Sequence, residues 1–379
     1  MKALDLFAGA GGWDIPAHAL GWDADGVEIM PEARATRAAA GLKTVADDVR
    51  DVDPVPGEYD ALIASPPCQT FSAAGSGTGR RALDAVLHGV RLFGQGGVRP
   101  TYAELAALTG DERTALVLEP LRVALASRPV FIAWEQVPPV LPVWEACAEV
   151  LCAAGYAVAT GNLSAEQYGV PQTRKRAFLL ARRDGQPAAL PTPTHSRYYS
   201  RTPDRLDGEV LPWVSMAEAL GWQSDLAVRS SVGDGGYNKP RDRPGHAPSP
   251  TVTSKSRSWV LRNGNQAKAC ERTTDQPAGT LFFGARLNAV EWHLRVTNDR
   301  PNTAHRPGTA PAPTLAFGKS RPEWDGAAGE KRPLAIEEAL VLQTFPADFP
   351  LQGSRTKQFL QVGNAVPPGL GAAVLRQLR

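Results

Sequence analysis

The residues best suited to covalent chemistry lie around Cys68. This cysteine stands in the phrase Ser-Pro-Pro-Cys-Gln-Thr-Phe-Ser, residues 65–72, after two prolines that restrict the backbone and before a glycine-rich stretch. An apolar run at 59–64 precedes the phrase and predicts a strand, and α/β enzymes place reactive side chains at the carboxyl ends of their strands. Cys68 is therefore a candidate nucleophile. The alternative is a buried structural cysteine, the commonest environment of an unpaired one.

A carboxyl group at the end of another predicted strand can assist such a nucleophile. Glu135 closes the apolar run at 130–135, so we expect it to face the same cleft. A carboxyl held protonated beside a nucleophile can donate to a ring nitrogen of the substrate. No metal is expected, because Cys147 and Cys152 are five residues apart, outside the spacing of zinc-binding pairs.

A glycine-rich loop and two acids predict a site for a nucleoside-type cofactor. The loop Phe7-Ala8-Gly9-Ala10-Gly11-Gly12 follows a predicted strand and opens a predicted helix, so its glycines allow a ligand to approach free backbone N–H groups. The loop lacks the spacing of a dinucleotide-binding fingerprint. Glu28 and Asp48 end the next two predicted strands, where acids can bind ribose hydroxyls and an adenine amino group. Either acid alone would be a solvated loop carboxylate; together they favour a cofactor site.

These side chains need a sheet whose strand ends meet at one edge. The first 180 or so residues alternate strand and helix signals, which is typical of an α/β fold with a parallel sheet. We predict strands at 2–7, 25–29, 44–49, 59–64, 130–135 and 176–181, and helices at 13–20, 31–40, 114–127, 143–154, 335–343 and 368–378. After about residue 190 the helical periodicity fades and Pro, Gly, Ser, Thr and Arg dominate the sequence. We therefore predict three parts: a catalytic and cofactor-binding domain at 1–189, a second, smaller domain at 190–330, and a segment at 331–379 that returns to the first domain.

The second part contains an internal repeat. Arg229, Arg262 and Arg295 are each 33 residues apart, and each precedes a similar Pro- and Thr-containing phrase. A basic residue and a tryptophan then follow, as in Arg321 and Trp324. A fixed period of this length predicts one small supersecondary unit used three times. The alternative is compositional drift in a proline-rich loop.

The charge of the chain is uneven and points to a polyanion. The net charge is only +2, but residues 229–321 carry 15 Lys and Arg against 6 Asp and Glu, a local charge of +9. This segment predicts a docked polyanion such as nucleic acid, or else a solvated basic surface. No apolar run is long enough for a membrane helix, and an acid at Asp5 interrupts any signal peptide, so we expect a cytoplasmic protein with no membrane partner.

Taken together, these phrases resemble the motifs of cytosine-C5 DNA methyltransferases of the bacterial or phage type. The resemblance spans 2–181 and 332–378 in the family's order. It rests on six phrases: the cofactor motif at 5–12, the nucleophile motif Pro67-Cys68-Gln69, the Glu-Asn-Val-like Glu135-Gln136-Val137, the Gln-Arg-Arg-x-Arg-like 172–176, and two late motifs at 332–346 and 361–368. Several phrases in order are far more specific than any one of them.

The resemblance implies a Rossmann-like, S-adenosylmethionine-dependent enzyme that methylates C5 of a flipped-out cytosine in a specific duplex DNA sequence and releases S-adenosylhomocysteine. It implies that Cys68 adds to C6, that Glu135 binds N3 and the exocyclic amine, and that Arg176, with Arg174 beside it, holds the O2 side. The cofactor residues that it implies are Phe7, Ala8, Gly9, Gly11, Gly12, Glu28, Ile29, Asp48, Val49, Pro67, Asn364 and Val366. We predict as DNA-binding residues Gln69 and Ser72, which follow Cys68, and Arg257, Arg286 and Arg321, the basic residues of the three repeats.

Several positions depart from the family pattern. Gln136 replaces the usual Asn, Thr173 replaces a usual Arg, and Ala74 stands where some members have a serine that enters the emptied base stack. The stretch 80–110 is longer than the pattern and suggests a lid or an extra DNA contact. With this resemblance, residues 190–330 are expected to form the target-recognition domain of a monomeric, nucleoid-associated enzyme, which can work beside a companion restriction enzyme.

Two other functions fit part of the pattern. An RNA cytosine methyltransferase would have the same fold, but the long basic region favours duplex DNA. A DNA-binding module without chemistry would not need Cys68, Glu135, Arg174 and Arg176. Methyl transfer to DNA against transfer to tRNA separates the three hypotheses.

Overall fold

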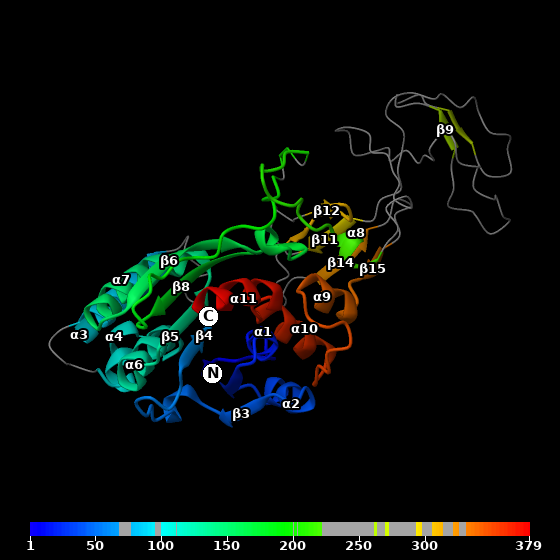
Figure 1. The fold of residues 1–379 in the computed structure, drawn as a ribbon. Coiled ribbons are helices and arrows are strands. Elements are labelled where there is room, and N and C mark those ends of the chain that lie inside the picture. Colours follow the sequence, from blue (N-terminus) through cyan, green and yellow to red (C-terminus); the bar gives the residue numbers. More distant parts are fainter. Residues whose placement is uncertain are drawn as a thin grey trace.

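The computed structural model describes residues 1–67, 77–94, 100–110, 112–199, 201–202, 204–221, 261–263, 270–272, 293–297, 305–313, 321–325 and 331–379. Its centre is a seven-stranded sheet of order β3-β2-β1-β4-β5-β8-β6 (Figure 1). The strands are β1 (Lys2–Leu6), β2 (Asp23–Val27), β3 (Lys43–Ala46), β4 (Ala61–Ala64), β5 (Phe131–Gln136), β6 (Ala157–Ser164) and β8 (Lys175–Arg182). All six predicted strands thus lie within a few residues of their expected positions.

The sheet is only partly parallel. Strands β1 to β5 pair in parallel, but β8 pairs antiparallel with both β5 and β6. The expectation of a parallel sheet throughout was therefore wrong at this edge. Strand β6 was not predicted, because its sequence includes Gly161 and Asn162, residues that are depleted in strands. The chain returns from β6 through a single 3₁₀ turn at Ala165–Tyr168 and the two-residue strand β7 (Gln172–Thr173), too short a connection for a parallel crossover.

Side chains of the central strands alternate between two apolar layers. Leu62, Ile132 and Leu179 point into one cluster, whereas their neighbours Ile63 and Leu180 point into the other. This period of two is that of a sheet buried on both faces. The first cluster is covered by α3 (Gly77–Gly94), α4 (Tyr102–Thr109), α6 (Glu119–Ser127) and α7 (Leu141–Ala153), and the second by α1 (Asp14–Ala19) and α11 (Pro368–Leu375).

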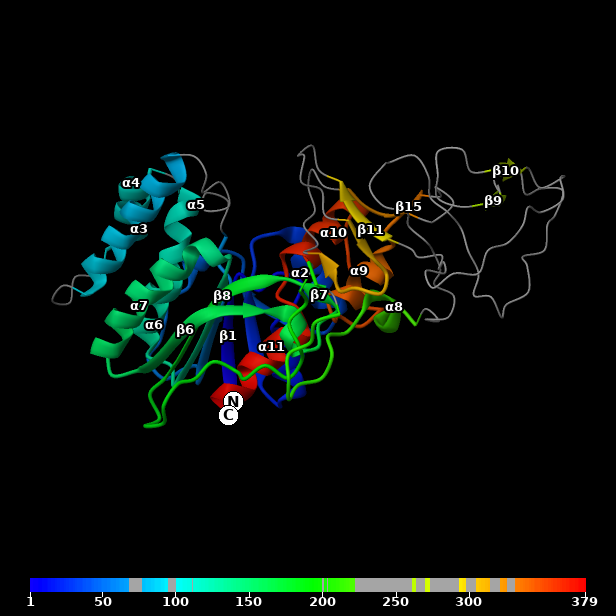
Figure 2. The same cartoon turned by 90° about the horizontal axis from the view of Figure 1, so that it is seen from above.

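The segment at 80–110 is part of the core in the residues that are described. Val86, Val90 and Phe93 of α3 and Leu105 of α4 are buried in the cluster that also holds Trp144 of α7. Figure 2 shows these helices stacked on one side of the sheet. The sequence-based expectation of a lid or an extra DNA contact is therefore incorrect for these buried faces. The predicted helix at 114–127 is broken into α5 (Glu112–Ala115), a 3₁₀ turn at Leu116–Leu118, and α6, which has Pro120 in its first turn.

The chain returns to the first domain at its carboxyl end, as expected. Helix α9 (Ile336–Leu342) and helix α11 were predicted, whereas α10 (Arg355–Asn364) was not. Leu370 and Val374 of α11 pack with Trp13 and Ala17 beside β1. The two termini consequently lie close together in both views (Figures 1 and 2).

The described parts of the second region are short strands. Arg262 lies in β9 (Leu261–Asn263), which pairs antiparallel with β10 (Cys270–Arg272), and Arg295 lies in β11 (His293–Thr297), which pairs antiparallel with β12 (His305–Pro307). Two of the three arginines that are spaced 33 residues apart thus lie in the first strand of an antiparallel pair. The other one, Arg229, lies outside the described residues. Strands β14 (Arg321–Asp325) and β15 (Lys331–Pro333) extend the β12-β11 pair to a four-stranded sheet.

Strand β14 is joined to the late motifs through Trp324. Trp324 is fully buried and packs with Met216 of α8 (Met216–Ala219) and with Leu340 of α9. Its indole N–H donates to Glu338 Oε2 at 2.8 Å, so this tryptophan is a core residue. Nearby, β13 (Ala312–Pro313) pairs in parallel with β7 of the first part. None of the helices in the described part of the chain is long and apolar enough to cross a membrane.

Candidate active site

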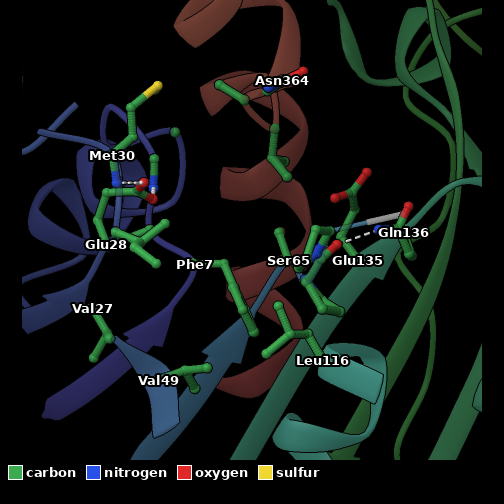
Figure 3. Close-up of a pocket in the computed structure, with 18 of the residues that line it drawn as sticks. Phe7, Val27, Glu28, Met30, Val49, Ser65, Leu116, Glu135, Gln136 and Asn364 are labelled. Atoms are coloured by element: carbon green, nitrogen blue, oxygen red, sulfur yellow. Dashed lines mark hydrogen bonds between the residues drawn. The ribbon is translucent and has the colours of Figure 1, made fainter. Parts of the chain in front are cut away.

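A cavity of about 670 Å³ opens where the carboxyl ends of β1 to β5 meet (Figure 3). This edge of an α/β sheet is the usual place for a ligand, and the volume is that of a small-molecule site. Most of the predicted residues line it. They are Phe7, Ala8, Gly9, Gly12, Glu28, Ile29, Asp48, Val49, Pro67, Glu135, Arg174, Arg176, Asn364 and Val366.

The loop after β1 forms the centre of the cavity wall. Phe7 adopts a left-handed backbone with φ of 62°, which is uncommon for a residue with a side chain and turns the chain sharply out of β1. A Cβ atom on Gly9 would meet nothing within 4 Å, whereas one on Gly12 would lie 2.4 Å from the backbone oxygen of Val366. Gly12 is thus required by the close approach of the last motif.

Gly11 does not line the cavity. Its φ is 108°, and an added Cβ would lie 2.3 Å from Leu42 Cδ1. Its requirement for glycine comes from the backbone and from packing on Leu42. That Gly11 contacts the cofactor stays a prediction.

Glu28 holds the loop after β1 to the start of α2 (Pro31–Ala39). Its Oε2 accepts from the backbone N–H of Gly9 at 2.8 Å, and its Oε1 accepts from that of Met30 at 2.7 Å. Glu28 is only 8% exposed, and that exposure faces the cavity. In Figure 3, Glu28 and Glu135 lie on opposite sides of Phe7. The carboxylate of Glu28 can accept further hydrogen bonds, since each oxygen has a second lone pair.

Asp48 caps a 3₁₀ turn at the end of the β3 segment. It accepts from the backbone N–H of Arg50 at 2.9 Å and from Arg50 Nε at 3.0 Å. These bonds to Arg50 lower the pKa of Asp48. We expected a strand at 44–49 with Asp48 near its end. In the structure, β3 ends at Ala46 and a 3₁₀ turn follows at Val49–Asp51.

The opposite wall carries an ion pair. Arg176 Nε lies 2.9 Å from Glu135 Oε1, and both side chains are largely buried. Glu135 comes from β5 and Arg176 from β8, so the antiparallel pairing of these strands brings the pair together. Pro67 lines the cavity beside them, and the next residue in the chain, Cys68, lies outside the described residues.

Comparison with known proteins decides the family. The model of the family described as C-5 cytosine-specific DNA methylase matches residues 1–87 and 106–379. The chain belongs to this family. It is 25% identical over 415 residues to Type II methyltransferase M.SacI of Streptomyces achromogenes, covering 100% of this chain and 92% of that protein. It is 26% identical over 393 residues to Type II methyltransferase M1.HphI of Haemophilus parahaemolyticus, covering 98% and 84%.

Solved structures show the same fold. A DNA modification methyltransferase encoded within an E. coli prophage superposes with a TM-score of 0.53 at 18% identity, covering 100% of this chain and 98% of that one. The S. pombe Dnmt2 methyltransferase gives a TM-score of 0.50 at 14% identity, covering 100% and 97%. The protein is thus a DNA (cytosine-5) methyltransferase with a Rossmann-like sheet, as the motifs implied.

Arg174 joins two parts of the methyltransferase. It is only 2% exposed, and its two terminal nitrogens donate to the backbone oxygens of Gly363 at 2.8 Å and Asn364 at 3.5 Å. Burial lowers the pKa of Arg174 to about 9. Arg174 therefore lines the cavity mainly as a link between the β7–β8 segment and the end of α10, while Arg176 is the arginine that meets Glu135.

Gln136 fixes the segment that precedes Cys68. Its side-chain amide donates to the backbone oxygen of Pro66 and accepts from the backbone N–H of Val137. Trp13 also holds this segment, because its indole N–H donates to Ser65 Oγ at 2.9 Å. Gln136, which stands where the family's motif has Asn, thus has a structural role. It joins β5 to the segment that precedes Cys68.

The predicted DNA-binding residues are mostly outside the described part of the chain. This holds for Gln69, Ser72, Arg257 and Arg286, as it does for Ala74. Arg321 is described in its backbone only, as the first residue of β14, paired with Thr297.

Sequence reasoning missed several residues of the cavity wall. They are Trp13, Met30, Asp47, Arg50, Ser65, Pro66, Tyr102, Arg113, Leu116, Gln136, Val137, Gln361, Gly363 and Ala365, together with Val27. About half of them lie inside the quoted motif phrases, although no role was predicted for them: Ser65, Pro66, Gln136, Val137, Gln361, Gly363 and Ala365. Most of the others adjoin predicted residues, so a wider selection around each motif would have included them. Tyr102 had no such signal, because it reaches the cavity from a helical segment that no motif marks.

Proposed function

We propose that this methyltransferase uses S-adenosylmethionine to methylate C5 of a cytosine flipped out of duplex DNA, through a covalent bond between Cys68 and C6. One observation carries the proposal. A single cavity brings Glu28, Asp48 and Phe7 to one side and the Glu135–Arg176 pair to the other, next to Pro67, the residue before Cys68. A cofactor and a base can therefore meet at one sheet edge.

The cavity wall suits an adenosyl cofactor. Acids after β2 and β3 can accept from ribose hydroxyls and from an adenine amino group, Phe7 offers a ring face, and Gly9 leaves open space where a side chain would intrude. Phe7, Glu28 and Asp48 would hold the nucleoside, with Asn364 and Val366 beside the loop after β1. Bound S-adenosylmethionine supplies an electrophilic methyl group, and S-adenosylhomocysteine remains after transfer.

The other wall supplies the groups that a cytosine needs. C5 of cytosine is a weak nucleophile until the Cys68 thiolate forms a bond to C6, which moves the C5–C6 π electrons toward C5. Glu135 can hydrogen-bond N3 and the exocyclic amine, and Arg176 can donate to O2, so that the charge that develops on the ring is stabilised. After methylation, loss of the C5 proton to a base and cleavage of the Cys68–C6 bond restore the aromatic ring. The base must leave the stack to reach these groups.

Residues 190–330 complete the proposal as the target-recognition domain. The excess of positive charge at 229–321 would supply the salt-dependent part of DNA binding. Arg257, Arg286 and Arg321 would read or position the duplex from the three repeats, with Gln69 and Ser72 near the flipped base. We further propose a monomeric enzyme acting on the nucleoid in the cytoplasm, with a companion restriction enzyme as in restriction-modification systems.

A mechanism-based trap tests the chemistry. Duplex DNA with 5-fluorocytosine should form a covalent complex with the wild-type enzyme in the presence of S-adenosylmethionine, because fluorine at C5 cannot leave as a cation. Cys68→Ser should form no complex and lose methyl transfer, since an alcohol is hardly ionised near neutral pH. Cys147→Ser, which changes a fully buried cysteine in the first apolar cluster, is the control and should still be trapped.

A second variant tests the carboxyl group. Glu135→Gln should lower kcat far more than it weakens DNA binding, because an amide can hydrogen-bond the base but cannot supply a proton to N3. Methyl transfer that persists in Cys68→Ser, or transfer to tRNA in place of DNA, would refute the proposal.

A further inference from the structure

Part of the cavity wall comes from a segment that the family pattern does not cover. The match to the family leaves out residues 88–105, which include the start of α4. Tyr102, the first residue of that helix, lines the cavity next to Asp48 and Arg50. The helix is firmly placed, because Thr101 and Glu104 form a capping box at its start and Leu105 is fully buried in the core.

Tyr102 contacts the residue that holds Asp48. The guanidinium carbon of Arg50 lies 5.4 Å from the centre of the Tyr102 ring, within the range of a cation–π interaction. Arg50 in turn donates through Nε to both Asp48 oxygens at 3.0 Å. Tyr102, Arg50 and Asp48 thus form a chain of contacts from the inserted segment to the acid proposed to bind adenine.

The 3₁₀ turn that carries Asp48 is also held from the other side. Arg122 of α6 donates to the backbone oxygens of Val49 at 3.3 Å and Val52 at 3.4 Å, while its Nε is bound by the buried Glu119 at 2.8 Å. The backbone of the turn is therefore fixed by α6. The side chain of Arg50, in contrast, is 42% exposed, and its guanidinium group lies over the Tyr102 ring.

We propose that Tyr102 is a positioning residue for the adenosyl cofactor: its ring holds Arg50, which holds Asp48 in the orientation that binds the nucleoside. This inference rests on the proposed cofactor site. It assigns the insertion a role in cofactor affinity and not in reading DNA. Because the effect passes through the cofactor, Tyr102 should influence the affinity for S-adenosylhomocysteine and the KM for S-adenosylmethionine, and leave the KM for DNA unchanged.

Calorimetry with S-adenosylhomocysteine on the full chain tests the assignment. Tyr102→Leu keeps an apolar side chain against the core but removes the ring face, and should weaken binding by about 5- to 30-fold. Tyr102→Phe keeps the ring and should stay within about threefold of wild type. Ala107→Ser, an exposed change on the same helix, is the matched control. Arg50→Ala should weaken binding as much as Tyr102→Leu, and the double variant should be no more than about twofold weaker than either single one.

The outcomes separate this inference from the proposed function. If Tyr102→Leu binds S-adenosylhomocysteine like wild type, or raises the KM for DNA alone, Tyr102 has no role in positioning the cofactor. If Tyr102→Leu and Tyr102→Phe weaken binding equally and lower the melting temperature, Tyr102 is only a packing residue. The proposed function fails by a different result: wild type that does not bind S-adenosylhomocysteine, or Phe7→Ala that binds it unchanged.

Discussion

The sheet region and the region after residue 190 are stabilised in different ways. The sheet has a separate apolar layer on each face, and Trp134 and Trp144 pack against each other inside one of them with ring centres 5.4 Å apart. The described strands of the second region have two to five residues. Its buried Trp324 shares a cluster with Leu334, Leu340 and Phe345, which belong to the late motifs.

This difference indicates which parts of the chain should depend on one another for their fold. Most of the cavity wall follows strands whose two apolar clusters have no fully buried member in the second region, so cofactor binding should depend little on that region. Strand β14 buries Trp324 against the segment after 331, so its fold should depend on the returning chain.

The largest effects should come from matched tryptophan changes. Trp134→Ala and Trp324→Ala each remove a fully buried indole and should each cost about 3–5 kcal/mol in the unit that holds it. Trp134→Ala should abolish both S-adenosylhomocysteine binding and DNA methylation. Trp324→Ala should lose DNA binding and methylation but keep S-adenosylhomocysteine affinity within about threefold. Calorimetry and thermal unfolding check this, and an equal loss of cofactor binding in Trp324→Ala would show that the two regions fold as one unit.

A buried acid beneath the cavity should give an intermediate effect that depends on pH. Asp5 is fully buried in β1, and burial, followed by the carboxylates of Asp14 and Glu28, raises its pKa well above the usual value. Between the unfolded pKa of about 3.9 and the raised value, the folded state binds more protons than the unfolded state. Asp5 therefore reduces the free energy of unfolding as the pH rises, by at most about 1.4 kcal/mol per pH unit.

Asp5→Asn removes this titration. Its free energy of unfolding, relative to wild type, should increase as the pH rises above about 4 in urea titrations. Asp60→Asn is the control. It changes an exposed carboxylate and should show no comparable trend. Parallel curves for Asp5→Asn and wild type would mean that Asp5 is ionised in the folded protein, paired through the Asp14–Arg37 ion pair nearby.

The smallest effects on stability should come from the arginines of the repeats. Arg257→Ala, Arg286→Ala and Arg321→Ala should each change the free energy of unfolding by about 0.5 kcal/mol or less. Each should instead change the methylated sequence, or reduce the slope of log affinity against log salt by about 1 if it contacts a phosphate. Bisulfite sequencing and salt titrations check this. Lower melting temperatures with unchanged sequence preference and salt slope would mean that the repeats are structural.

The sequence by itself determined the parts of this protein that local patterns encode. Short, continuous apolar runs located β1, β2, β4 and β5 to within a few residues, and the phrases around Phe7, Pro67 and Glu135 located the cavity wall. Both succeed because hydrophobic period and turn chemistry act over a few residues. The family resemblance rests on the same short phrases, so it identified the enzyme and left open how distant segments meet.

Only the tertiary structure decided the contacts between such segments. Arg174 meets the backbone of Gly363, 189 residues away, and this contact is what separates its role from that of Arg176. The antiparallel β8 places Arg176 against Glu135, and the packing of α3 and α4 turns an apparent lid into core and brings Tyr102 to the cofactor wall. Gly11 and Gly12 are adjacent and identical in type, yet one packs on Leu42 and the other on Val366. Which partner a side chain finds depends on how the layers pack, and no pattern of neighbouring residues encodes that.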